Sequence, residues 1–92
     1  MTDQEINEAV AKKLNIIPAP PHYGEAPDFC HSIETAWIIS DYTKSHGLSF
    51  GIANDPVSKQ WHCIIISSKV HIDEWGDTAP MAICLAFLKL EN

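Results

Sequence analysis

The sequence has 92 residues, 46% of them hydrophobic and 20% charged, which is the composition of one small globular domain spanning residues 1–92. Twelve carboxylates outnumber six lysines, no arginine occurs, and the formal net charge is −6. Arginine is the side chain that grips phosphates and guanine edges, so direct nucleic-acid binding is not expected. No apolar run reaches the roughly 18 residues of a membrane span, and the N-terminus lacks a signal-peptide pattern. The sequence therefore predicts a cytoplasmic protein without membrane contact.

The three cysteines are Cys30, Cys63 and Cys84. An odd number of thiols in a chain without an export signal does not indicate a disulfide framework. We expect reduced, buried thiols that pack as small hydrophobic groups.

The first predicted element is a helix that begins at Thr2, because Thr2 and Glu5 have the spacing of a capping box. Ile6, Val10 and Leu14 recur every four residues and form one narrow apolar stripe. This pattern is typical of a helix that lies against the surface of the core.

Residues 15–31 are predicted to form an ordered, proline-rich loop. Four prolines and a glycine between Asn15 and Asp28 exclude a helix or a central strand. A loop of this length in so small a chain either covers the core or contributes to function. We expect it to form part of a contact surface.

The second helix is predicted to begin between Cys30 and Ser32 and to end at His46, with Gly47 in the left-handed conformation that follows many helices. Trp37 lies at the centre of its expected apolar face. We therefore predict that Trp37 anchors the core.

Strand periodicity replaces helix periodicity after Gly47. Residues 48–55 and 60–67 read as two strands joined by a turn, and residues 69–75 as a third strand at the sheet edge or a long strand-like loop. In the middle strand one face carries Trp61, Cys63 and Ile65, and the other carries His62, Ile64 and Ile66. Both faces are largely apolar, so we expect this strand to be covered on both sides.

The last predicted helix begins after Asp77 or Thr78, and Pro80 lies in its first turn, where the missing N–H costs nothing. From Met81 to Leu90 nearly every residue is apolar, so more than one face must be covered. A second copy of the chain is one source of that cover. A homodimer through this helix is therefore one prediction.

Together the elements predict an α+β fold, a small alpha-beta-alpha sandwich with an antiparallel sheet of two or three strands. The expected order is helix, helix, strand, strand, the third strand where residues 69–75 form one, and helix. Two helices on one side of the sheet and the third on the other would account for a central strand that is apolar on both faces.

The segments SIETAW, in the second helix, and DTAPMAICLAFLKL, near the end of the chain, resemble the phage ABA sandwich domain, a family of small phage and prophage proteins. The positions that carry the resemblance are Ile33, Trp37, Asp77, Thr78, Ala82, Ile83, Cys84 and Ala86. Members have a short entry to the second helix, where this chain has residues 28–32 after a longer proline loop. The resemblance implies an alpha-beta-alpha layered fold and a phage setting, hence the cytoplasm of a host cell, and no established activity.

Two adjacent pairs of cysteine and histidine raise the question of a metal site. A metal ion needs several ligands that converge on one point. His62 and Cys63 point to opposite faces of a strand, and Cys30 and His31 lie about 100 degrees apart if they are helical. We expect one buried cysteine and one exposed histidine in each pair, with no metal and no cofactor.

The sequence predicts no catalytic residue. Cys63 lies in the middle of a strand beside Trp61 and reads as a core thiol rather than a nucleophile. Cys30 lies at a helix N-terminus, which favours a thiolate, but the position equally suits a capping or packing residue. The carboxylates around His71, before the last helix, read as a solvated acidic turn.

Binding of another protein is the function that remains. Aromatic side chains such as Trp75 are enriched in interfaces, and a stiff proline loop presents a surface at low entropic cost. The predicted partner-binding residues are His22, Tyr23, Glu25, Asp28, His31, Asp73, Glu74 and Trp75.

The acidic charge predicts a partner with a basic surface. We expect a non-catalytic phage or prophage accessory protein that inhibits a nucleic-acid-handling host defence complex, such as CRISPR-Cas or a restriction enzyme. One alternative is an oligomeric sponge for a nucleotide-like signalling ligand, with Trp61, Trp75 or Tyr23 stacking on the base. A second alternative is a small metal-binding or hydrolytic protein.

Overall fold

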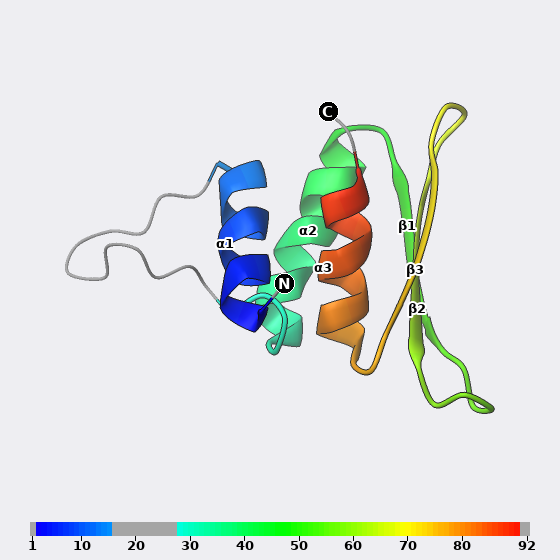
Figure 1. Ribbon diagram of the computed structural model, residues 1–92. Helices are drawn as coiled ribbons and strands as arrows, with labels where there is room; N and C mark the ends of the chain where they lie inside the picture. Colours follow the sequence, from blue (N-terminus) through cyan, green and yellow to red (C-terminus); the bar gives the residue numbers. More distant parts are fainter. Residues whose placement is uncertain (1, 16–27, 91–92) are drawn as a thin grey trace.

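The computed structural model describes residues 2–15 and 28–90, and in this part of the chain three helices pack on an antiparallel sheet (Figure 1). The elements are α1 (Asp3–Lys13), α2 (Ile33–Ser45), β1 (Ser49–Asn54), β2 (Trp61–Ile66), β3 (His71–Gly76) and α3 (Ala79–Lys89). The predicted α+β class, the element order and the third strand are confirmed. The predicted proline loop falls largely on residues 16–27, outside the described residues. No helix in the described ranges is long and apolar enough to cross a membrane.

The sheet has the order β1-β2-β3, with β2 in the centre and antiparallel to both neighbours. Strand alternation divides the side chains of β2 as the sequence predicts. Cys63 and Ile65 point toward the helices and are fully buried. Their neighbours His62 and Ile64 point to the other side and are half-buried.

All three helices lie on one side of the sheet, whereas one of them was expected on the opposite side (Figure 1). The expectation rested on the apolar residues of both faces of β2. In the sheet, however, Ile64 lies between Gly51 of β1 and Asp73 of β3, so its neighbours are small or polar. The outward face of β2 is therefore shielded only in part by the adjoining strands, and no described helix covers it.

Helix α3 is the central element of the described fold. It packs on the sheet and also contacts α1 and α2, which explains why its sequence is apolar on nearly every side. Its fully buried residues are Ala82, Ile83, Cys84, Ala86 and Phe87. Elements of the same chain thus supply the cover that a second copy was expected to give. The homodimer remains a prediction, which a solution mass measurement tests.

Helix α2 is rotated relative to the prediction. Its buried residues are Ala36, Ile39, Ser40 and Thr43, which recur with helical spacing. Trp37 lies beside this stripe, is 44% exposed, and contacts Phe50 edge-on at 6.0 Å between ring centroids. The prediction that Trp37 anchors the core was wrong, because the small residues of α2 allow the helix to approach α3 closely.

The ends of the helices follow the sequence signals. Thr2 and Glu5 form both hydrogen bonds of the capping box, Ser32 and Thr78 cap α2 and α3, and Gly47 has a φ of 73°. Gly76, at the end of β3, lies so close to α3 that a Cβ there would stand 2.7 Å from the backbone nitrogen of Ala82. This contact fixes the turn from the sheet into the central helix.

Candidate functional site

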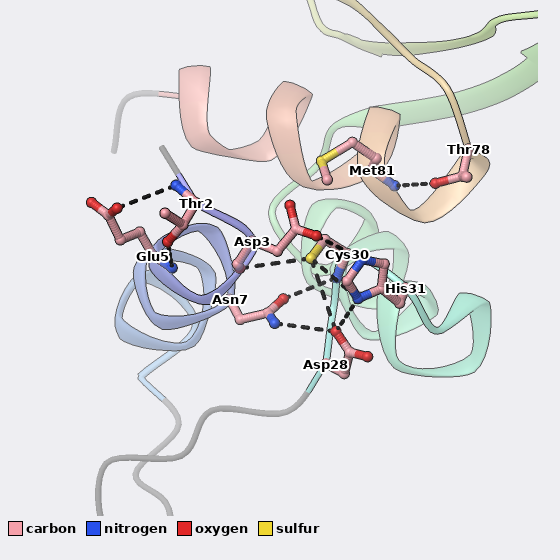
Figure 2. Close-up of polar contacts among 9 residues, drawn as sticks. All are labelled: Thr2, Asp3, Glu5, Asn7, Asp28, Cys30, His31, Thr78 and Met81. Atoms are coloured by element: carbon pink, nitrogen blue, oxygen red, sulfur yellow. Dashed lines mark hydrogen bonds and ion pairs between the residues drawn. The ribbon is translucent and has the colours of Figure 1, made fainter.

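The densest group of polar contacts in the described chain joins the start of α1 to the segment before α2 (Figure 2). Its members are Asp3 and Asn7 from α1, and Asp28, Cys30 and His31; we call them the His31 cluster. The imidazole of His31 lies between two carboxylates, with Nε2 2.8 Å from Asp3 Oδ2 and Nδ1 2.9 Å from Asp28 Oδ1. Both ring nitrogens are therefore engaged.

A short turn places Cys30 and His31 in the cluster. The carbonyl of Asp28 accepts hydrogen bonds from the backbone N–H groups of His31 and Ser32, and Ser32 then caps α2. Phe29, fully buried between these polar residues, anchors the turn in the core. The segment is a turn rather than the first turn of a helix, so Cys30 and His31 are not separated by the helical angle assumed from the sequence.

Asn7 holds the turn to α1. Its Oδ1 accepts a hydrogen bond from the backbone N–H of Cys30 at 3.0 Å, and its Nδ2 donates to Asp28 Oδ1 at 3.2 Å. One amide side chain thus satisfies both a backbone donor and a carboxylate. This arrangement fixes Asp28 in the position from which it contacts His31.

The two carboxylates raise the pKa of His31. The hydrogen bond to Asp28 is the largest cause, followed by the charge of Asp28; burial opposes the increase, and the charge and hydrogen bond of Asp3 add to it. A histidine whose two nitrogens both face carboxylates is stabilised as the imidazolium, which donates through both. His31 is 53% exposed, so its proton exchanges freely with solvent.

The Cys30 thiol has the surroundings of an unreactive group. It is fully buried, 3.7 Å from the carbonyl oxygen of Asp3 and 3.9 Å from both Asp28 Oδ1 and His31 Nδ1. Burial raises its pKa, and the charges of Asp3 and Asp28 raise it further. Burial likewise raises the pKa of Cys63 and that of Cys84 to about 12. All three thiols are thus poor nucleophiles at neutral pH.

A second candidate surface is the side of the sheet that faces away from the helices. We call it the outer sheet face; its side chains are Ser49, Ala53, His62, Ile64, Ile66, His71, Asp73 and Trp75, with Gly51 among them. Trp75 is 43% exposed and Ile66 is 38% exposed. Strand β1 contributes only small residues to this face, so the larger apolar side chains of β2 and β3 project beyond those of β1.

Asp73 organises the polar groups of the outer sheet face. Its Oδ1 lies 2.6 Å from His62 Nε2 and its Oδ2 lies 2.6 Å from His71 Nε2. Burial raises the pKa of Asp73, but the hydrogen bonds from His62 and His71, with their charges, outweigh this and leave the pKa below its usual value. The His62 ring also stacks on Trp75 at 4.3 Å between centroids, which holds the indole in one orientation.

The predicted partner-binding residues divide between these two surfaces. Asp28 and His31 belong to the His31 cluster, whereas Asp73 and Trp75 lie on the outer sheet face. The helices all lie on the other side of the sheet (Figure 1). Glu74 points to the helix side of the sheet, where its Oε2 lies 2.6 Å from Lys89 Nζ. His22, Tyr23 and Glu25 lie outside the described residues.

Several residues of both surfaces were missed by reasoning from the sequence. On the sheet, alternation already placed His62 and Ile66 on one face, and that signal could have added them to the predicted set. Asp3 and Asn7 carried no such signal. Their contacts reach residues more than twenty positions away, and only the packing of α1 beside the segment 28–32 brings them together.

Comparisons with known proteins agree on the fold. A family model described as the phage ABA sandwich domain matches residues 7–88. A solved structure, a phage protein from Bacillus cereus ATCC 14579, superposes with a TM-score of 0.80 at 21% sequence identity and covers 97% of this chain and 86% of that chain. No curated protein matches the chain at a significant level. The similarity supports the fold and a phage protein family, and it indicates no catalytic family.

Proposed function

This chain belongs to the phage ABA sandwich domain family, and we propose that it is a non-catalytic phage or prophage accessory protein that acts by binding another protein. The proposal includes the class of partner, a host defence complex that handles nucleic acid, such as CRISPR-Cas or a restriction enzyme. The outer sheet face is the proposed docking surface.

One observation carries the proposal: the outer sheet face exposes Trp75 and Ile66 on a rigid strand scaffold. Tryptophan is among the residues most enriched at the centres of protein interfaces, where it fills a recess of the partner. Trp75 is already oriented by the stack with His62, so little side-chain entropy remains to be lost on binding. The surrounding polar groups, paired through Asp73, suit the rim of such an interface.

Charge supports a basic partner. The chain as a whole has a net charge of −6 and contains no arginine, whereas the carboxylate of the outer sheet face, Asp73, is paired with His62 and His71. Complexes that hold nucleic acid expose lysine and arginine to the phosphate backbone, and an acidic protein is attracted to the same surfaces. The low reactivity of the buried thiols supports binding rather than covalent catalysis as the mode of action.

A pull-down from host lysate tests the proposal. The wild-type chain is expected to recover a specific partner in low salt and to lose it as ionic strength rises, because charge-driven docking is screened. Trp75→Ala should abolish recovery. Val57→Ala is the matched control, since Val57 is 90% exposed but lies in the turn between β1 and β2, and it should recover the partner normally.

Two outcomes would contradict the proposal. The first is the absence of any specific partner in low salt, where attraction between opposite charges is strongest. The second is a partner that Trp75→Ala recovers as well as the wild type does, which would place the docking surface elsewhere on the chain.

The nucleotide sponge has one observation in its favour, the exposed ring of Trp75. His62 stacks on one face of the indole, and 43% of Trp75 is exposed to solvent. A thermal-shift screen of cyclic nucleotides separates the two functions: a shift that Trp75→Ala removes supports the sponge, and no shift with any nucleotide leaves protein binding.

A further inference from the structure

The His31 cluster brings together three kinds of metal ligand, and we propose that Asp3, Cys30 and His31 bind one zinc ion. Each residue offers one ligand atom, and the three atoms lie within 4.8 Å of one another. They come from two separate parts of the described chain, the first turn of α1 and the turn before α2 (Figure 2). This site is independent of the outer sheet face and of the function proposed for it.

The ligand atoms are close to the spacing that tetrahedral coordination of zinc requires, and small side-chain movements would bring them to it. Zinc bonds of about 2.0–2.3 Å require ligand atoms roughly 3.3–3.8 Å apart. In the structure the three ligand atoms lie within 4.8 Å of one another, and the nitrogen that faces Asp3, His31 Nε2, lies 2.8 Å from Asp3 Oδ2. A side-chain adjustment of about 1 Å therefore brings a thiolate, an imidazole and a carboxylate to bonding distance, and water fills the fourth position.

Asp28 and Asn7 act on the ligands rather than on the ion. A metal-bound histidine usually donates its other ring N–H to a carboxylate, and Asp28 Oδ1 already lies 2.9 Å from His31 Nδ1. His31 therefore coordinates through Nε2, which faces Asp3. Asn7 holds both Asp28 and the backbone of Cys30, so the second layer of the site exists before the ion arrives.

The donor set selects zinc over calcium and magnesium. A thiolate and an imidazole suit zinc, whereas calcium and magnesium prefer a shell made of oxygen atoms. On binding, Zn²⁺ replaces the proton of the Cys30 thiol and the proton that His31 shares with Asp3. Two protons pass to solvent, and the three ligands together then carry two negative charges opposite the ion. Asp3 and His31 are each 53% exposed, which gives the ion a path into the site.

The bound ion ties the beginning of α1 to the turn before α2. In the metal-free chain this junction depends on the packing of Phe29 and on hydrogen bonds such as that from the Cys30 N–H to Asn7. A structural zinc ion that bridges two segments converts its binding free energy into folding free energy. Zinc is thus expected to raise the melting temperature of the chain, and a chelator to reverse the change.

Titration of the full chain with Zn²⁺, and with Co²⁺ as a visible substitute, tests the site. We expect one ion per chain with a dissociation constant at or below about 1 μM. The cobalt form should show a thiolate-to-metal charge-transfer band that is absent in Cys30→Ser. Asp28→Asn should weaken zinc about 10- to 100-fold, and Asp3→Asn or His31→Gln should weaken it further.

The matched control is Asp73→Asn, which breaks the other histidine–aspartate group and should leave zinc affinity unchanged. If Cys30→Ser does not fold, as judged by circular dichroism, the exposed variant Asp3→Asn and the cobalt band of the wild type still decide the question. No uptake of either metal overturns the proposal. So does a cobalt complex without a thiolate band, or zinc binding that is lost in Asp73→Asn and kept in Asp3→Asn.

Discussion

Residues 2–15 and 28–90, which the structure describes, contain two histidine–aspartate groups of opposite composition. In the His31 cluster one imidazole lies between two carboxylates, and on the outer sheet face one carboxylate, Asp73, lies between His62 and His71. In each group the central residue has two partners of the other type, and its pKa is shifted. The pKa of His31 is raised, chiefly by Asp28, whereas the pKa of Asp73 is lowered because hydrogen bonds from two histidines outweigh the opposing effect of burial.

The two groups therefore stabilise the fold in different pH ranges. A raised histidine pKa stabilises the folded state fully below the unfolded value of about 6.5, and this is lost as pH rises through the folded pKa. A lowered aspartate pKa stabilises the folded state above about pH 3.9 and is lost as pH falls through the folded pKa. At pH values between the folded pKa of Asp73 and that of His31, both groups stabilise the fold. The contribution of Asp73 is lost at lower pH and that of His31 at higher pH.

The two groups also differ in their attachment to the core. The largest change in stability is expected from a substitution that removes this attachment in the His31 cluster. Phe29 is fully buried within the turn that carries the His31 cluster, so Phe29→Ala should cost about 3–5 kcal/mol of unfolding free energy. Denaturant titration measures the loss. A loss below about 1 kcal/mol would show that the turn is not anchored by the core.

Asn7→Ala is expected to have the next largest effect. The variant leaves the backbone N–H of Cys30 without its side-chain acceptor, and an unsatisfied buried donor costs about 1–3 kcal/mol. Asn7→Asp keeps an acceptor for that N–H but places a second carboxylate against Asp28, so its loss of stability also includes charge repulsion. A loss within about 0.5 kcal/mol in Asn7→Ala would mean that the Cys30 contact contributes nothing.

Replacing the central imidazole tests the pH dependence of the His31 cluster. With a chelator present, His31→Gln should be less stable than the wild type at acid pH, and the difference should shrink as pH rises through the raised pKa of His31. NMR titration of the ring should give a pKa above the ordinary value of about 6.5, and Asp28→Asn should bring it back toward that value. An unchanged pKa in Asp28→Asn would contradict the assignment of Asp28 as the main cause.

Asp73→Asn tests the opposite case on the sheet. The wild type should lose stability as pH falls through the lowered pKa of Asp73, and the variant should lack this part of the acid dependence. Denaturation curves between about pH 2 and 5 measure it. Identical acid profiles for the two proteins would show that Asp73 gains nothing from His62 and His71.

Trp75→Ala is expected to change stability least. Its side chain stacks on His62 of the neighbouring strand and is 43% exposed, and such cross-strand pairs contribute about 0.2–1 kcal/mol. The melting temperature should therefore barely move, although partner recovery should be lost. A large fall in melting temperature would make Trp75 a residue of the fold rather than of an interface.

Local chemistry could be predicted from the sequence wherever one segment sufficed. The Thr2–Glu5 capping box, the left-handed Gly47 and the division of His62 from Cys63 by strand alternation are all as expected. Each depends on residues within a few positions of one another. The phage family and the α+β class were likewise accessible, because their signals lie within individual helices and strands.

Tertiary relations could not be predicted in the same way. Trp37 was assigned to the core from helical spacing, but α2 turns a row of smaller residues toward α3. The pairing of Asp3 with His31 depends on how α1 packs beside a distant turn. The sequence of β2 alone also does not determine on which side of the sheet a helix lies. Its outward residue Ile64 is apolar, yet it is shielded in part by the adjoining strands and no described helix covers it.

The central position of α3 has a consequence for synthesis on the ribosome. The helix that the sheet, α1 and α2 all contact follows every one of them in the sequence. Until it emerges, the apolar sides of the preceding elements lack the helix on which they pack, so the nascent chain cannot complete this core from residues 2–76. Premature termination before Ala79 therefore leaves a product without this core.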